Sequence, residues 1–186
     1  MKQNDKRVKR TKKALQLALA DLMTQKELRS ITVQELADKA ELHRATFYAH
    51  YHDVYDLYEQ LESSVISELD RIITSDPTHR YENVYQSLID FIFDNASLTR
   101  MFLISGTNDF FWNNVHSLIE EKYLNIWLYE ENKTVVSDEM RFLAAYHIQG
   151  CLAIISAWVK ENFSHSKEEI LRLIHTVDKN FDKIAV

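Results

Sequence analysis

Residues 31–57 read ITVQELADKAELHRATFYAHYHDVYDL, and this stretch decides the fold expected for the N-terminal part of the chain. Thr32 and Glu35 have the Thr-x-x-Glu spacing of a capping box, which predicts the start of a helix. After a tight turn, a second short helix is expected to run to about Tyr51. Two short helices separated by a tight turn, with a longer helix on either side, predict a helix-turn-helix.

The second of these short helices has an inward and an outward face. Phe47 and Tyr51 lie one helical turn apart and are expected to pack inward with Leu42. The outward face is small and polar, which suits a helix that fits closely into the major groove of DNA. Hydroxyls there bind phosphate oxygens, and an arginine can bind guanine through two hydrogen bonds. The residues in question are Arg44, Ala45, Thr46, Tyr48, Ala49 and His50.

Helical periodicity continues on both sides of this stretch. One helix is expected over residues 7–23, and Asp53 is expected to cap another over 54–73. Asp76-Pro77 interrupts the pattern, because the residue before a proline avoids helical geometry. We therefore expect a DNA-binding domain over residues 1–75 and a helical C-terminal domain over 76–186. Further helices are predicted near 81–95, 98–104, 109–128, 138–163 and 167–184, the last with a capping box at Ser166 and Glu169.

Composition supports an all-α protein. The sequence is 46% hydrophobic and 27% charged, which is typical of a globular chain with a full core. Two glycines and one proline are few for the turns that sheets and nucleotide folds require. The single cysteine, Cys151, excludes an internal disulfide. We find no leader peptide and no uninterrupted apolar stretch that approaches the ~18 residues of a membrane span, so a cytoplasmic protein is expected.

The net charge of −6 is unevenly distributed along the chain. Residues 1–13 contain seven basic side chains and one acidic side chain, a local charge of +6 that includes Lys12. Residues 1–60 carry 11 basic and 9 acidic side chains, a net of +2, and the remaining residues carry 11 and 19, a net of −8. A basic N-terminal region can approach a polyanion despite an acidic remainder. A solvated tail is the alternative interpretation of the first 13 residues.

At this point the sequence resembles the DNA-binding domain of the TetR family of transcriptional regulators, strongly over residues 7–60. The family pattern is met by Thr32, Leu36, Ala37, Thr46, Phe47, Tyr48, His50, Tyr51 and Leu57. The C-terminal part resembles a TetR subgroup at Gly150, Trp158 and residues 166–169. The resemblance implies a DNA-binding regulator, a repressor in particular. We expect no cofactor. The resemblance also implies DNA contacts at Thr32, Arg44, Ala45, Thr46, Tyr48, Ala49 and His50, to which the basic N-terminal region adds Lys12.

Three positions differ from many relatives. Glu41 stands where the turn often has glycine, and it would be strained at a positive φ. Val54 stands where a phosphate-binding lysine is common, and His43 replaces a frequent capping serine. Glu41 and Val54 favour the alternative function, a protein-interaction module that keeps the regulator fold and acts through a partner protein rather than on DNA.

The C-terminal part is rich in aromatic residues. By the resemblance, a small-molecule effector binds among these helices, and aromatic side chains line apolar pockets well. The candidate effector-binding residues are Phe102, Phe111, Trp112, Trp127 and Tyr146. The alternative is that these side chains fill the core.

The last two predicted helices have long apolar faces, which suggest a homodimer. The first face comprises Met140, Leu143, Ala144, His147, Ile148, Cys151, Ile154 and Ile155, and the second comprises Ile170, Leu171, Ile174, Val177 and Phe181. As in TetR relatives, two such helices from each subunit are expected to form a four-helix bundle. This arrangement would place two recognition helices ~34 Å apart, which predicts a palindromic double-stranded DNA operator.

Other chemistry has little support in the sequence. The pairs His147/Cys151 and His116/Glu120 have the i, i+4 spacing of metal ligands, but further ligands for a four-coordinate zinc site are not evident. Glycine-rich phosphate loops, nucleophile elbows and zinc-protease motifs are missing from the sequence. We therefore predict neither an enzyme nor a metal site.

Overall fold

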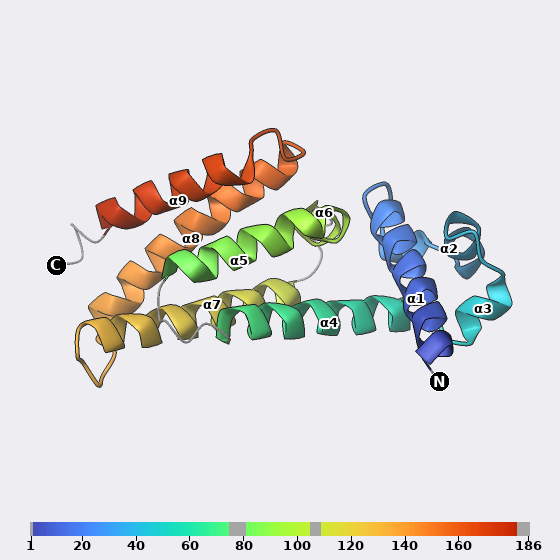
Figure 1. The fold of residues 1–186 in the computed structure, drawn as a ribbon, viewed down its shortest axis with the longest axis horizontal. Coiled ribbons are helices and arrows are strands. Elements are labelled where there is room, and N and C mark those ends of the chain that lie inside the picture. The colour runs from blue at the N-terminus through green and yellow to red at the C-terminus, as the bar shows by residue number, and fades with distance from the viewer. Residues whose placement is uncertain (1, 75–80, 105–108, 182–186) are drawn as a thin grey trace. The chain divides into compact units, whose positions relative to one another are not determined.

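The computed structural model describes residues 2–74, 81–104 and 109–181, and within these ranges the chain is helical with no β-strand (Figure 1). The all-α fold predicted from the sequence is confirmed. The helices are α1 (Lys2–Met23), η1 (Leu28–Ser30), α2 (Val33–Lys39), α3 (Arg44–Tyr48), α4 (Val54–Thr74), α5 (Tyr81–Asp94), α6 (Ala96–Ile104), α7 (Asp109–Glu130), α8 (Asp138–Lys160) and α9 (Lys167–Phe181).

The chain forms two compact units. The first unit comprises Met1–Val65 and Ser97–Thr107, and the second comprises Ile66–Ala96 and Asn108–Val186. Helix α4 thus contributes its first half to one unit and its second half to the other. The expected boundary between 75 and 76 lies outside the described residues, so the domain limits 1–75 and 76–186 stay a prediction.

The core of the first unit is built where the helical pattern places apolar side chains. Leu15 and Leu19 of α1 are fully buried, as are Leu36 of α2, Phe47 of α3 and Leu57 of α4. These residues come from four helices, so burial of their side chains joins the two short helices to the longer ones. Removing such a side chain costs about 2–5 kcal/mol, because the remaining structure closes the cavity only partly.

Helix α1 begins earlier than the sequence pattern indicates. It starts at Lys2 rather than near residue 7, so the basic N-terminal segment is helical in the described structure rather than a tail. Lysine, arginine and glutamine lose little side-chain freedom in a helix and therefore extend it readily. The described cations Lys6, Arg7 and Arg10 are exposed near the start of α1.

The second unit is a helical bundle in which α8 packs against both α7 and α9, and α5 packs against α9. Trp158 of α8 is almost fully buried, and its Nε1 donates to the carbonyl oxygen of His165, 2.9 Å away. Lys167 Nζ at the start of α9 donates to Asp90 Oδ1 of α5 at 2.5 Å. These two contacts fix the loop between α8 and α9 against the bundle.

Helix starts follow the predicted caps. The Asp53 carboxylate accepts from Asp56 N at 2.9 Å at the start of α4. Ser166 and Glu169 form the predicted reciprocal pair at the start of α9, since Ser166 N donates to Glu169 Oε2 and Glu169 N donates to Ser166 Oγ. Such caps satisfy N–H groups that have no partner within the helix.

Helix α8 ends at Lys160, three residues before the predicted end. Asn162 and Phe163 have φ of 58°, outside the helical region. Phe163 N donates to Trp158 O at 2.9 Å and Asn162 N donates to Val159 O at 3.0 Å, which is the bonding pattern of a Schellman motif. The aromatic rings of Trp158 and Phe163 then meet edge to face at 4.9 Å.

The faces of α8 and α9 that we expected to form the dimer bundle are mostly buried within one chain. Six of the eight α8 positions and Ile170, Leu171 and Ile174 of α9 are buried, so they are not available to a second subunit. The side chain of Phe181 lies outside the described part of the structure. Packing against α5 and α7 within the second unit accounts for this burial and corrects the expected choice of faces.

Among the described residues, α8 is long and apolar enough to cross a membrane. Length and composition alone are weak evidence, since the core helix of a soluble protein also passes this test. The buried face of α8 packs in the second unit, which accounts for its apolar character.

Candidate nucleic-acid interface

Helix α3 ends at Tyr48 rather than near Tyr51, but the inward and outward side chains of residues 44–51 lie as predicted. Phe47 is fully buried and Tyr51 is 3% exposed, with their ring centroids 5.7 Å apart. On the other side, Tyr48 is 48% exposed. The recognition surface, defined as Arg44, Ala45, Thr46, Tyr48, Ala49 and His50, has Thr46 and His50 partly buried and its other members exposed.

Arg44 and Tyr48 form a pair that sequence reasoning missed. Arg44 Nη2 donates to Tyr48 Oη at 2.9 Å, and the guanidinium carbon lies 5.3 Å from the centre of the Tyr48 ring. Their i, i+4 spacing is the signal by which the pair could have been found. The contact places a cation and a phenol side by side on the exposed face of α3, where both can reach a polyanion.

Lys12 of α1, predicted as a DNA contact, lies beside Tyr51, which follows α3 and packs inward. Its Nζ is 5.5 Å from the centre of the Tyr51 ring. Tyr51 carries a raised pKa because of burial first and the nearby Asp56 carboxylate second. Asp56 itself has a lowered pKa, mainly because it accepts from the backbone N–H of His52 and from Gln60.

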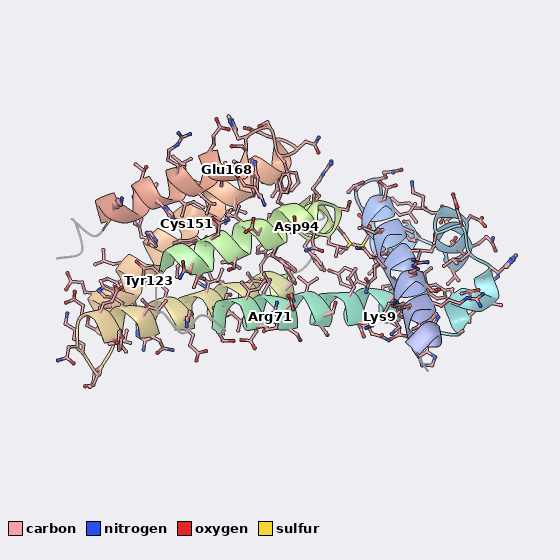
Figure 2. All side chains as sticks on the ribbon, in the orientation of Figure 1. Lys9, Arg71, Asp94, Tyr123, Cys151 and Glu168 are labelled. Carbon is pink, nitrogen blue, oxygen red and sulfur yellow. The ribbon has the colours of Figure 1, made fainter. Side chains whose placement is uncertain are left out.

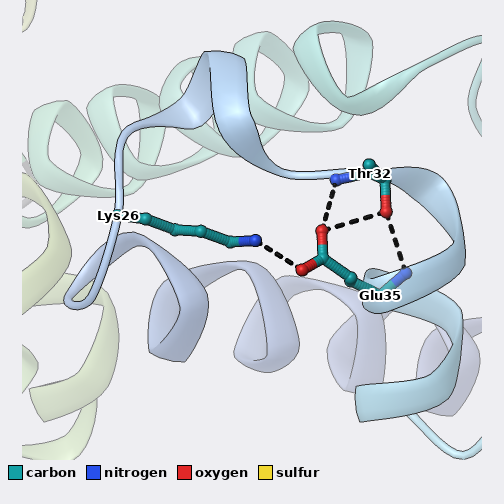
Figure 3. Close-up of polar contacts among 3 residues, drawn as sticks. All are labelled: Lys26, Thr32 and Glu35. Atoms are coloured by element: carbon teal, nitrogen blue, oxygen red, sulfur yellow. Dashed lines mark hydrogen bonds and ion pairs between the residues drawn. The ribbon is translucent and has the colours of Figure 1, made fainter.

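Thr32 caps α2 through the predicted capping box (Figure 3). Its Oγ1 accepts from Glu35 N at 3.2 Å and lies 2.9 Å from Glu35 Oε2, while its backbone N–H donates to the same carboxylate oxygen at 3.0 Å. Lys26 Nζ donates to the other oxygen, Oε1, at 2.5 Å. These bonds lower the pKa of Glu35 to about 2, with the Lys26 bond the largest cause.

The turn between α2 and α3 contains the strained residue anticipated from the sequence. Glu41 has φ of 55°, the left-handed region that favours glycine. Leu42 N donates to Ala37 O at 2.9 Å and Glu41 N donates to Asp38 O at 3.1 Å, so α2 ends in a Schellman motif. The turn therefore forms both hydrogen bonds of a Schellman motif, although the side chain of Glu41 is sterically disfavoured in the left-handed conformation.

The other two departures from the family pattern have plain structural outcomes. His43 occupies the N-cap position of α3 and makes no side-chain capping bond. Val54, at the first position of α4, is 5% exposed and belongs to the core. A side chain that packs inward there offers no cation to a phosphate.

The predicted effector-binding residues lie in different surroundings. Phe102 is buried in the first unit, where its ring centroid lies 6.0 Å from that of Tyr58. Phe111 and Trp112 of α7 meet edge to face at 5.3 Å. The other two residues, Trp127 beside the buried Tyr123 and Tyr146, which is 73% exposed on α8, lie elsewhere in the second unit.

Two hollows in the second unit differ in size. A cavity of about 20 Å³ beside Tyr85 and Tyr123 has the volume of about one water molecule. An open groove of about 500 Å³ lies between α7 and α8 and is in the size range of ligand sites. Of the predicted effector-binding residues, Trp112 lines this groove. Its other lining residues are Asn113, His116, Gln149, Leu152, Ala153 and Ser156.

A buried polar cluster joins α5, α7 and α8. Tyr85 Oη lies 2.9 Å from His147 Nε2, and Cys151 Sγ lies 3.7 Å from the same nitrogen. The ring of Tyr123, labelled with Cys151 in Figure 2, lies 5.0 Å from that of His147. The described residues contain no group of three or more His, Cys, Asp or Glu side chains placed to hold a metal ion.

The first unit, with two short helices joined by a tight turn and an exposed polar face on the second, defines a helix-turn-helix protein. A family model described as the transcriptional regulator C-terminal region of TetR proteins matches residues 80–179, more than half of the chain. The chain belongs to the TetR family of transcriptional regulators, which is not a family of enzymes.

Individual relatives agree with this assignment. The biofilm operon icaADBC negative transcriptional regulator IcaR of Staphylococcus aureus is 23% identical over 170 residues, covering 83% of this chain and 91% of IcaR. Among solved structures, the dihydroxyacetone kinase operon activator DhaS has a TM-score of 0.62 at 17% identity, covering 94% of this chain and 96% of DhaS. NalD of Pseudomonas aeruginosa, the secondary repressor of the MexAB-OprM multidrug efflux pump, has a TM-score of 0.61 at 14% identity, covering 96% and 97%.

Proposed function

We propose that this regulator is a cytoplasmic homodimer that binds a palindromic DNA operator and represses transcription until a small-molecule effector binds its second unit. The observation that carries the DNA-binding part is the recognition surface of α3. Its Arg44–Tyr48 pair is exposed, while Phe47 and Tyr51 anchor the helix from the other side. Repression rather than activation is supported by the names of IcaR and NalD, although DhaS is named an activator.

The DNA contacts divide by chemistry. Thr46 and Tyr48 present hydroxyls that suit phosphate oxygens, and Arg44 suits a guanine edge. The small side chains Ala45 and Ala49 allow the close approach that a major groove requires. Further contacts to the phosphate backbone of the DNA come from Thr32, His50 and the N-terminal cations, including Lys12. The Thr32 hydroxyl is engaged with Glu35, so its contribution depends on exchanging that partner.

Dimerisation through the last two helices is supported by apolar side chains that α8 and α9 leave exposed. Phe142 is 77% exposed and Tyr146 is 73% exposed on α8, and Leu173 is 47% exposed on α9. Large exposed apolar side chains on neighbouring helices are typical of subunit interfaces. A two-fold dimer presents two recognition helices ~34 Å apart to successive major grooves.

The groove between α7 and α8 supports an effector site at Trp112, the predicted residue that lines it. Its polar lining side chains, Asn113, His116, Gln149 and Ser156, suit a ligand with hydrogen-bonding groups. An effector that binds one conformation of the dimer and a DNA operator that binds another weaken each other's affinity by the same factor.

Fluorescence anisotropy with the purified protein and the DNA that flanks its own gene tests the proposal. We expect tight binding at low salt that weakens steeply between about 50 and 200 mM salt, because binding to DNA releases counterions. Binding that is absent at low salt, or unchanged across this window, would overturn it.

The alternative is a protein-interaction module that acts through a partner regulator. The strained turn at Glu41 and the buried Val54, which leaves one common phosphate contact unmade, favour this function. Capture of a partner regulator by a protein that ignores all DNA would support it over the operator-binding function.

A further inference from the structure

Helix α8 carries an exposed stripe along the side opposite its buried face. The stripe residues recur at intervals of three and four, the spacing of a helix that packs against another helix. All of them are exposed, although several are apolar. The stripe consists of Glu139, Phe142, Tyr146, Gln149, Gly150, Ala153, Ala157 and Lys160, of which Gln149 and Ala153 also line the groove between α7 and α8.

The stripe is complementary to itself when it is reversed. In an antiparallel pair centred between Gln149 and Gly150, every residue number and its opposite add up to 299. Phe142 then lies opposite Ala157, and Tyr146 lies opposite Ala153, so a large ring faces a small side chain at each step. This alternation is what two closely packed helices require.

The charged residues at the two ends of the stripe are related by the same antiparallel symmetry. Glu139 at one end of the stripe lies opposite Lys160 at the other end, so an antiparallel pair contains this contact twice. A parallel pair would place each of these charges against its own copy, which is repulsive. The charges therefore favour one orientation as well as one register.

Gly150 at the centre supports a close approach. A glycine within a helix is destabilising relative to alanine, because it loses more conformational freedom on folding. A Cβ added at Gly150 would meet nothing within 4 Å in this chain, so packing within the chain does not require glycine there. A second helix that crosses at this point would benefit from the missing side chain.

We propose that α8 pairs antiparallel with α8 of a second copy of this chain, with the two-fold axis between Gln149 and Gly150. The pairing rests on the proposed homodimer and specifies its register. It joins Glu139 of each copy to Lys160 of the other and seats Phe142 and Tyr146 over the small residues of the partner helix.

Charge exchange in the full-length protein tests the register. Sedimentation equilibrium should show that Glu139→Lys and Lys160→Glu each raise the dimer Kd about tenfold or more, because each places like charges together twice. The double variant Glu139→Lys/Lys160→Glu should return the Kd to near the wild-type value. Arg141→Glu, on a different side of α8, is the matched control and should leave the Kd unchanged.

Cysteine pairing gives a second readout. In Tyr146→Cys/Ala153→Cys, the two cysteines of one chain are about 10.5 Å apart along the helix, too far for a disulfide within the chain. Oxidation should therefore produce covalent dimers on a non-reducing gel. Phe142→Cys/Ala153→Cys, which does not match the register, should produce few. The wild type, whose Cys151 is buried, gives the baseline.

The outcomes separate the register from the function on which it rests. The antiparallel register is overturned if neither single charge change weakens the wild-type dimer, if the double change does not restore the Kd, or if the matched cysteines do not cross-link. Each of these results leaves operator binding standing. A wild-type monomer at every concentration overturns both the register and the proposed dimer. A dimer with the expected responses that ignores DNA supports the register while the operator-binding function fails.

Discussion

The hydroxyl oxygen of Tyr48 already accepts a hydrogen bond within the chain. Arg44 Nη2 donates to the phenol oxygen, so the Tyr48 proton remains available for donation to an acceptor such as a phosphate. The guanidinium beside it adds positive charge where a phosphate would bind. At the scale of single residues, the affinity of the recognition surface for DNA should therefore depend strongly on one oxygen atom.

Tyr48→Phe and Thr46→Ala remove one hydroxyl each and leave the buried side of α3 intact. We expect each variant to weaken operator binding about tenfold or more, since hydrogen bonds to charged groups contribute about 1.5–3 kcal/mol. Anisotropy titrations measure the affinity, and urea unfolding should show little change in stability. If both variants bind the operator as the wild type does, α3 does not dock on DNA through this surface.

Phe47→Ala is the contrasting variant on the same helix. It removes a fully buried ring and should lower the free energy of unfolding by about 3–5 kcal/mol. Loss of DNA binding in this variant would follow from loss of the fold, so it separates the buried side of α3 from the exposed side.

Glu35 makes the capping of α2 dependent on pH. Its pKa in the folded chain is about 2 against an ordinary value of 4.5, because Lys26 and Thr32 bind the ionised form. A lowered pKa contributes stability above pH 4.5 that is lost as the pH falls toward 2. Glu35→Gln can still accept from the Thr32 backbone but does not titrate. Thermal unfolding from pH 5 to pH 2 should show the wild type losing its advantage over this variant, and a constant difference in Tm would contradict the prediction.

At the scale of helices, apolar spacing and caps predicted most of the fold. The helix starts at Val33, Val54 and Lys167 follow from capping residues read in the sequence, and these are local signals. The early start of α1 and the early ends of α3 and α8 were not predicted, because several residue types extend or end a helix equally well until packing decides. Trp158 and Phe163, for example, meet at the end of α8 in a ring contact that the sequence pattern does not reveal.

The positions of the candidate site residues were likewise predicted only in part. The inward Phe47 and Tyr51 and the exposed Tyr48 were predicted from helical periodicity. The predicted effector-binding residues lie in different surroundings, since an aromatic side chain fills a core as readily as it lines a pocket. Tyr146 is exposed and Phe102 is buried in the first unit, which depends on long-range packing rather than on local sequence.

The turn between α2 and α3 should be improved by Glu41→Gly. Glycine adopts φ of 55° without the steric cost of a side chain, whereas its greater freedom in the unfolded chain offsets part of the gain. We expect a net increase of about 0.5–1 kcal/mol in the free energy of unfolding. Glu41→Ala removes the charge and keeps the strain, so it is the control. Equal stability of the two variants would show that the left-handed conformation carries no cost here.

At the scale of the whole molecule, the sign of charge differs between the ends of the chain, with +2 over residues 1–60 and −8 over the rest. Electrostatic attraction to DNA must therefore come from the N-terminal helices. The exposed cations Lys6, Arg7 and Arg10 lie in the first turns of α1, which begins at Lys2. Their contribution should be independent of DNA sequence, because phosphates are the same at every base pair.

The triple variant Lys6→Gln/Arg7→Gln/Arg10→Gln should therefore weaken binding to the operator and to unrelated DNA by similar factors. The slope of log K against log salt should become shallower by about 0.9 for each phosphate that the variant no longer neutralises. Arg172→Gln on α9, in the acidic part of the chain, should change neither the affinity nor the slope. Tyr48→Phe gives the opposite comparison, since it should reduce operator binding with little change in the slope. If the triple variant keeps the wild-type slope, the N-terminal cations do not bind DNA, and the recognition surface must supply the electrostatic attraction alone.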